Sequence, residues 1–225
     1  MDTEINPTGV DQLKEQTMKT QKISTLIGMI SALSIVSVAS AGLELTNSNR
    51  GFELGDVSGW VSFPTGDSTF DVTGDAFSGG FAGDLNNLAT GSSAVIKQAN
   101  LGIGSVEAFQ EVTISFMAKG MGEIGGVSFA EFFSEIDGGG VSSSVLLGGA
   151  PLFVTSDWQE YSFTTTTGAD VSGGVTLQFA AVTGANIGSS MQLFIDDVSV
   201  SIVPAPASAV LLGFGGLIAT RRKRG

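Results

Sequence analysis

Short runs of alternating apolar and polar residues constrain the fold of this chain more than any other feature. Between residues 42 and 202 such runs recur roughly every ten to fifteen residues, separated by turns rich in Gly, Asp and Ser. In 110–120, Val112, Ile114 and Phe116 fall on one side of a strand, with Thr and Ser residues between them. No useful segment of helical period lies in this region. The pattern predicts an all-β fold, either a sandwich or a barrel, and the other predicted strands are 68–72, 93–98, 126–133, 143–148, 159–167, 174–182 and 193–203.

The charge of the chain is distributed unevenly. Residues 42–203 hold only three basic residues, Arg50, Lys97 and Lys119, against 18 acidic ones, which gives that part a net charge of −15. Such a surface repels nucleic acid and anionic lipid and attracts cations. The chain has no Cys and no His. Disulfides, thiol nucleophiles, thiolate metal sites and the commonest general base are therefore excluded.

The N-terminal region resembles an export signal in its composition. Lys19 and Lys22 precede an apolar stretch, 23–38, and Ala39-Ser40-Ala41 has the small-residue pattern of a cleavage site. We therefore expect a signal-peptide helix over 18–41, with cleavage after Ala41 and export of the rest. Residues 1–17 are acidic and do not fit such a signal, so we expect translation to start at Met18. The alternative is a core helix of the folded domain.

The C-terminal region combines a short apolar run with a basic end. The part after Pro206 would cover about 20 Å as a helix, which is less than the roughly 30 Å hydrocarbon core of a bilayer. Four basic residues follow it and would stay on the cytoplasmic side: Arg221, Arg222, Lys223 and Arg224. This predicts a short hydrophobic helix that holds the exported chain in the membrane transiently. A permanent anchor is the alternative.

The two ends together resemble a known sorting arrangement. A signal peptide, the tetrapeptide Val203-Pro204-Ala205-Pro206, a short apolar segment and a basic cluster are similar to the PEP-CTERM signal, although Ala205 replaces the usual Glu. The resemblance implies that an exosortase, a membrane processing enzyme, removes the tail of a protein bound for the cell surface or extracellular matrix. The predicted divisions are 1–17, a mis-assigned extension; 18–41, the signal peptide; 42–202, the β domain; and 203–225, the sorting signal.

The last predicted strand carries an acidic residue on an apolar face. The two-residue period places Asp196 with Phe194, Val198, Val200 and Ile202 on a side that should point inward. A buried carboxylate needs a partner, and cationic side chains are scarce here. In a chain without His or Cys, its hard oxygen ligands favour calcium over zinc. The alternative is that Asp196 lies at the rim and accepts hydrogen bonds from backbone amides.

Five short stretches, in order, resemble jelly-roll carbohydrate-binding modules of the galactose-binding-like superfamily. They are NRGFELGDVSGW (49–60), GSSAVIK (91–97), EVTISFMAKG (111–120), SDWQEYSFTTT (156–166) and LFIDDVSV (193–200). The resemblance implies a jelly-roll β-sandwich with a structural calcium ion. Its ligands would be Glu53 and Asp196, with Asp197 as a substitute and backbone carbonyls near Gly51.

A sugar site of this family needs aromatic rings on which pyranose rings stack. Trp60 and Trp158 match family positions that lie in or near the core. The remaining candidates are Phe129, Phe132, Phe133 and Tyr161, of which Phe132 lies opposite in register to the other two phenylalanines. The alternative is that these rings are core residues.

A catalytic role is not predicted. Carboxylate pairs such as Glu131 and Glu135 arise by chance in so acidic a chain, and no G-x-S-x-G motif or phosphate-binding loop is present. The sequence favours an exported, calcium-stabilised, carbohydrate-binding-like module that interacts with an exosortase and with polysaccharide. The second hypothesis is a structural surface or matrix protein without a specific sugar ligand.

Overall fold

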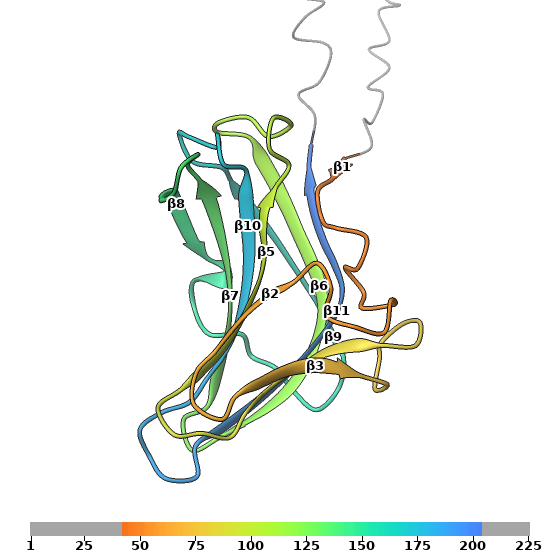
Figure 1. Ribbon diagram of the computed structural model, residues 1–225, viewed down its shortest axis with the longest axis vertical. Helices are drawn as coiled ribbons and strands as arrows, with labels where there is room; N and C mark the ends of the chain where they lie inside the picture. Colours follow the sequence, from red (N-terminus) through yellow and green to blue (C-terminus); the bar gives the residue numbers. More distant parts are fainter. Residues whose placement is uncertain (1–41, 204–225) are drawn as a thin grey trace, which may run out of the picture. The chain divides into compact units, whose positions relative to one another are not determined.

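Two antiparallel β-sheets make up the part of the chain that the computed structural model describes, residues 42–203 (Figure 1). The six-stranded sheet has the order β3-β4-β11-β6-β9, with β1 paired to β11, and the five-stranded sheet has the order β2-β5-β10-β7-β8. The strands are β1 (Leu43–Glu44), β2 (Val61–Pro64), β3 (Thr69–Thr73), β4 (Ala82–Asn87), β5 (Ser93–Leu101), β6 (Glu111–Glu123), β7 (Val127–Glu135), β8 (Val141–Leu146), β9 (Gln159–Thr166), β10 (Val175–Val182) and β11 (Ser190–Ile202). The predicted all-β sandwich is confirmed.

The predicted helices over 18–41 and in the C-terminal tail lie outside the described residues. Within 42–203, no helix is long and apolar enough to cross a bilayer.

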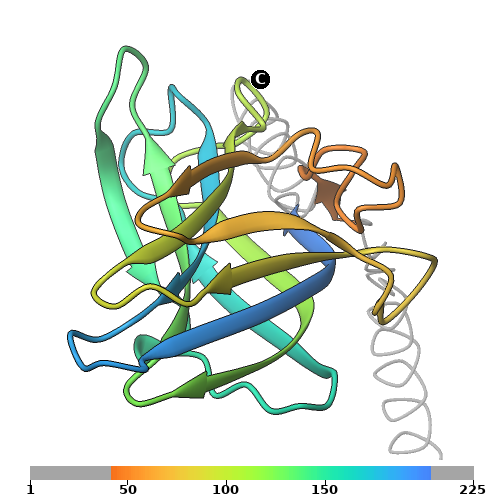
Figure 2. The same ribbon diagram turned by 60° about the horizontal axis from the view of Figure 1, so that its bottom comes forward.

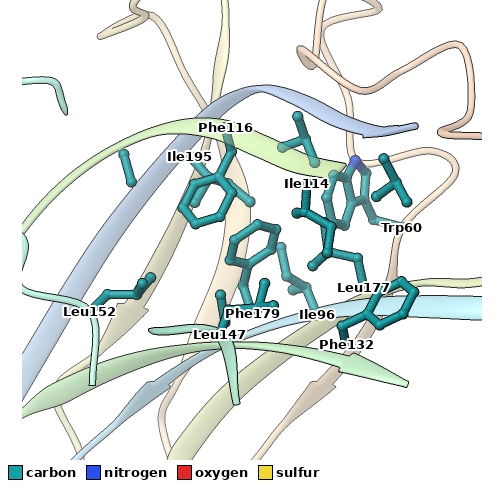
Figure 3. Close-up of a cluster of buried hydrophobic side chains, with 14 of the residues drawn as sticks. Trp60, Ile96, Ile114, Phe116, Phe132, Leu147, Leu152, Leu177, Phe179 and Ile195 are labelled. Carbon is teal, nitrogen blue, oxygen red and sulfur yellow. The ribbon is translucent and has the colours of Figure 1, made fainter. Parts of the chain in front are cut away.

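The core lies between the two sheets and is built from the inward side of each strand. Val112, Ile114 and Phe116 of β6 are buried, as the alternation predicts. Leu177 and Phe179 of β10 approach them from the other sheet. The rings of Phe116 and Phe179 meet edge to face with centroids 4.8 Å apart, so one aromatic pair joins the two sheets (Figure 3).

Three strands were not predicted, and each lacks a clear strand signal. β4 has the sequence AGDLNN, in which Gly, Asp and Asn are typical of turns, yet it lies between β3 and β11. β1 has only two residues, and β2 is a four-residue edge strand that ends at Pro64. Their neighbours in the sheet, and not their own residues, determine their conformation.

A β-bulge in β11 makes the predicted inward side wrong for Phe194 and Asp196, whereas Val198, Val200 and Ile202 are buried as predicted. Asp196 pairs with Met117 and Ser199 with Ser115, so β11 holds one residue more than β6 between these pairs. Asp197 takes up the extra residue with a φ of 47°. The inward side therefore consists of Met191, Leu193 and Ile195 before the bulge and Val198, Val200 and Ile202 after it, all buried.

The bulge leaves Phe194 and Asp196 on the outer side of the six-stranded sheet, and not in the core as the plain alternation predicts. Asp196 is nevertheless 0% exposed. The loop between β3 and β4, residues 74–81, covers it there, beside the segment that leads from β1 to β2 (Figures 1 and 2).

Both ends of the described chain leave the sandwich at the same place. Leu43 of β1 pairs with Ile202 of β11 in an antiparallel ladder. The other end of β11, at Ser190, pairs with Glu123, where β6 ends. The loops at that end are thus separated from the chain ends by the whole length of β11.

Candidate functional site

A polar row flanked by aromatic rings crosses the outer side of the five-stranded sheet. Lys97 of β5 pairs with Gln178 of β10, and Gln178 pairs with Glu131 of β7. Gln178 Nε2 donates a hydrogen bond of 2.5 Å to Glu131 Oε2. Two residues before and after Glu131, on the same side of β7, stand Phe129 and Phe133.

We call this surface the aromatic face, and it consists of Phe63, Lys97, Phe129, Glu131, Phe133 and Gln178. Phe63, on the edge strand β2, is 51% exposed, whereas Phe129 and Phe133 are half-buried. The small side chain of Ala180 lies opposite Phe129 in the ladder. The face therefore offers apolar ring surface beside an ammonium, an amide and a carboxylate.

The four predicted ligand-binding residues do not lie on one surface. Phe129 and Phe133 belong to the aromatic face. Phe132, on the opposite side of β7, is 0% exposed and belongs to the core, so the structure removes it from the candidate surface. Tyr161 lies in the other sheet, on β9, and stacks on Phe116 with centroids 5.3 Å apart. The inclusion of Phe132 was wrong because its ring is buried in the core. Tyr161 is half-buried and stays a prediction, on the other sheet.

Asp196 accepts three backbone hydrogen bonds at the bulge. Phe77 N and Ser78 N each donate to Asp196 Oδ2 at 3.0 Å, and Asp197 N donates to Oδ1 at 2.7 Å. Ser78 Oγ also donates to Asp197 Oδ1 at 2.9 Å. Burial raises the pKa of Asp196 above its ordinary value, although the amide hydrogen bonds act in the opposite direction. These contacts agree with the alternative hypothesis, in which Asp196 accepts hydrogen bonds from backbone amides.

Glu53 holds the other end of the same loop. Its carboxylate accepts hydrogen bonds from Gly80 N, at 2.9 Å, and from Phe81 N, at 3.2 Å. Gly79 has a φ of 62°, and a Cβ there would lie 2.3 Å from a Glu53 carboxylate oxygen. Glycine is favoured at this position, because a side chain would need both a left-handed backbone conformation and a displaced Glu53 carboxylate.

The four predicted calcium ligands meet this loop but differ in their placement. A Cβ built on Gly51 would lie 3.4 Å from both Asp196 Oδ1 and Asp197 Oδ1, so these two oxygens flank one stretch of backbone. Carboxylate and carbonyl oxygens are the donors that calcium prefers. Glu53 directs both oxygens to loop amides. Within 42–203 no three acidic side chains converge on one point in the manner of a metal site. The carboxylate and carbonyl oxygens are of the kind that calcium prefers. In these positions, however, the oxygens of Asp196 and Asp197 near Gly51 supply only part of a calcium coordination shell.

A hollow of about 290 Å³ lies beside the bulge on the outer side of the six-stranded sheet. Its walls include Phe77, Ser115, Met117, Glu160 and Asp197. Sequence reasoning missed this hollow because Phe77 comes from a loop whose course depends on Asp196 and Glu53.

Trp158 neighbours this hollow through Phe77. The two rings lie edge to face with centroids 6.2 Å apart. Lys119 Nζ lies 5.0 Å from the Trp158 ring centroid and pairs with Asp75 at 2.6 Å. Trp60, in contrast, is a core residue that stacks on Phe52. Trp60 thus lies in the core, as expected, whereas Trp158 is half-buried on the outer side of the six-stranded sheet.

The chain matches no protein-family model and no curated protein. Among solved structures, it is similar to the CBM22-1 xylan-binding domain of Paenibacillus barcinonensis Xyn10C, with a TM-score of 0.51 and 17% identity over 75% of this chain and 99% of that one. It is also similar to the Stig cyclase Fisc from Fischerella sp. TAU, with a TM-score of 0.52 and 14% identity over 73% and 100%. A third match is the enzymatically active domain of bacteriophage CBA120 tailspike protein 4, with a TM-score of 0.56 and 16% identity over 71% of this chain and 21% of that one.

At these identities the similarity shows the fold alone. Residues 42–203 have the two-sheet sandwich of carbohydrate-binding modules, and the cyclase and the enzymatically active tailspike domain share it. The function has to be argued from the site.

Proposed function

We propose that this protein is a non-catalytic, surface-exposed module that binds polysaccharide on its aromatic face. The observation that carries the proposal is the polar row Lys97–Gln178–Glu131 with Phe129 and Phe133 on either side of it. The fold similarity to a xylan-binding domain supports it.

The chemistry of a sugar chain matches this arrangement. A pyranose ring has apolar C–H faces, which stack on aromatic rings, and hydroxyl groups at its edges, which exchange hydrogen bonds with amide, carboxylate and ammonium groups. Because the row crosses the strands, the backbones of its three residues span two strand spacings, or about 9.6 Å. A sugar chain lying across the strands would meet them in turn.

Retention of the full chain on insoluble polysaccharides tests this proposal. Xylan, β-glucan and galactan should be compared, and Phe129→Ala and Phe133→Ala should each weaken retention about fivefold, since stacking on one ring contributes about 1 kcal/mol. Phe153→Ala is the matched control, because Phe153 is 83% exposed and stands outside the aromatic face. Retention that is insensitive to both face variants, or absent from every polysaccharide, would favour a structural surface protein.

The structural alternative rests on a specific observation. Phe129 and Phe133 are half-buried, so part of their ring surface already contacts the protein. A face of this kind can contribute to folding without a ligand. The retention measurement separates the two functions because only a binding surface responds to a polysaccharide.

We further propose that calcium stabilises the loop 74–81 and its supports. Asp196, Asp197 and backbone oxygen near Gly51 would hold the ion, with Glu53 completing the set. The raised pKa of Asp196 supports this, because a cation would relieve the cost of its buried charge. EDTA should lower the melting temperature by several degrees and millimolar calcium should restore it. Identical melting in both buffers would leave the amides as the sole partners of Asp196.

The same proposal includes export and sorting. Cleavage after Ala41, membrane contact through the apolar C-terminal segment and removal of that segment by an exosortase would bring residues 42–203 to the cell surface or extracellular matrix. The sequences around Ala39, Val203 and Arg221 support this step.

A further inference from the structure

Lys97 differs from the other two cations of residues 42–203. Arg50 pairs with Glu44 at 2.9 Å, and Lys119 pairs with Asp75 at 2.6 Å. No carboxylate of the described residues lies within ion-pair distance of Lys97 Nζ, although that part of the chain has 18 acidic residues. Although residues 42–203 are strongly acidic, Lys97 therefore has no ion-pair partner among them.

Two aromatic rings hold this ammonium in place. Lys97 Nζ lies 5.3 Å from the centroid of the Phe63 ring and 5.7 Å from that of Phe133. Lys97 is half-buried, so its aliphatic stem covers apolar surface while the rings replace part of the water around the charge. A less hydrated, positioned ammonium attracts an anion more strongly than a lysine that moves freely in water.

Glu131 does not neutralise Lys97. Gln178 stands between them in the row and donates its amide hydrogen to Glu131. Lys97 Nζ and the Glu131 carboxylate make no ion pair, whereas a carboxylate attracted to Nζ would contact it directly. Because the Coulomb energy falls with distance, such a carboxylate would gain more from this contact than it would lose by repulsion from Glu131 and from the more distant acidic residues.

We infer that Lys97 binds the carboxylate of a uronic acid residue, so that the ligands of the aromatic face are uronate-containing glycans. The inference rests on the proposed glycan binding and names its substrate class. The sugar ring would lie on Phe129 or Phe133, with its carboxylate directed to Lys97 Nζ. Gln178 and Glu131 would bind hydroxyl groups farther along the chain.

Calorimetric titration of the full chain with tetragalacturonate and tetramannuronate, each compared with its methyl ester, tests the inference. Esterification removes the charge and adds one methyl group per carboxyl, and the variants below separate these two effects. The acid should bind about three- to tenfold more tightly than the ester, the range expected for one partly desolvated ion pair. Raising the salt from about 50 mM to about 500 mM should remove most of this preference, because the Debye length shortens to a few ångströms.

Three variants assign the preference to Lys97. Lys97→Met keeps an apolar stem between Phe63 and Phe133 and loses the charge, so it should bind acid and ester equally. Lys97→Arg should retain the preference. Arg50→Met removes the same charge away from the aromatic face and should also retain it. A melting temperature of Lys97→Met equal to that of the wild type shows that this variant is folded.

Each result that contradicts the inference has a distinct meaning. Equal binding of acid and ester by the wild type, weakened by Phe129→Ala, overturns the uronate inference and leaves glycan binding intact. A preference for the acid that persists in Lys97→Met overturns the assignment to Lys97. If neither the acid nor the ester binds, the uronate inference is overturned. If no neutral polysaccharide binds either, the proposed function is overturned as well.

Discussion

Replacing Asp196 by alanine should destabilise the domain whether or not calcium is present. The substitution removes the acceptor of three backbone amides, those of Phe77, Ser78 and Asp197. It also removes a buried charge, whose cost is visible in the raised pKa of the carboxyl. If each amide loses about 1 kcal/mol net of that cost, the free energy of unfolding falls by about 3 kcal/mol. For a domain of this size, that lowers the melting temperature by roughly 6–12 °C.

Urea unfolding followed by tryptophan fluorescence is the suitable assay. Trp60 lies in the core, and Trp158 contacts Phe77 of the loop, so the two rings report on different parts of the same transition. Measurements in EDTA isolate the contribution of the amides, and a second series in calcium should raise the stability of the wild type but not of Asp196→Ala. The loop should also become more sensitive to protease in this variant.

Asp196→Asn is the matched control. The amide keeps one oxygen for Phe77 and Ser78, while its NH₂ group faces the N–H of Asp197, so the loss should be about half that of the alanine variant. An Asp196→Ala protein within about 0.5 kcal/mol of the wild type, with an unchanged m-value, would refute the reasoning. The loop would then be held by Glu53 and by its own contacts.

Three further predictions concern other parts of the chain. Burial raises the pKa of Asp84, helped by the charge of Asp71 and opposed by the hydrogen bond from Gln192. Its folded-state pKa therefore exceeds the unfolded value, and the stability that it contributes is lost as the pH rises through the folded-state pKa. Asp84→Asn should flatten the pH dependence of unfolding above the ordinary aspartate pKa, about 4, and stabilise the domain at neutral pH. A Cβ at Gly83 would lie 2.6 Å from the buried Phe52 ring, so Gly83→Ala should cost about 1–3 kcal/mol in thermal unfolding, whereas Gly74→Ala, with open space around it, should cost little. N-terminal sequencing and intact mass of the surface form should show a start at Gly42 and loss of the chain after the 203–206 region; a form that retains the basic C-terminal residues would be a plain membrane anchor.

The sequence predicted the elements whose own residues carry the pattern. In β6 and β10 three alternate residues are large and apolar, so the inward side could be identified before the structure was known; they are Val112, Ile114 and Phe116 in β6 and Val175, Leu177 and Phe179 in β10. β4 could not, because its Gly, Asp and Asn residues form a strand only between β3 and β11. The influence of neighbouring strands on such a segment cannot be inferred from its own sequence.

The candidate site shows the same division. The period of β7 correctly separated Phe132 from Phe129 and Phe133, but nothing in the sequence aligned Lys97, Gln178 and Glu131, since that row depends on the order β5-β10-β7. The burial of Asp196 was predicted for the wrong reason. The bulge reverses the side of the strand, and the loop 74–81 supplies the burial that the core does not.

The shared exit of the two chain ends has a mechanical consequence. A force applied between Leu43 and Ile202 would open the two-residue β1–β11 ladder one bond at a time, which requires little force. A chain held at Val203 while its aromatic face grips a fixed polymer is loaded differently. The tension then runs along β11, whose hydrogen bonds to β6 and β4 lie perpendicular to the strand and share the load in shear. The 13 residues of this strand would make the domain a far stronger link between its C-terminal attachment and its ligand than between its own two ends.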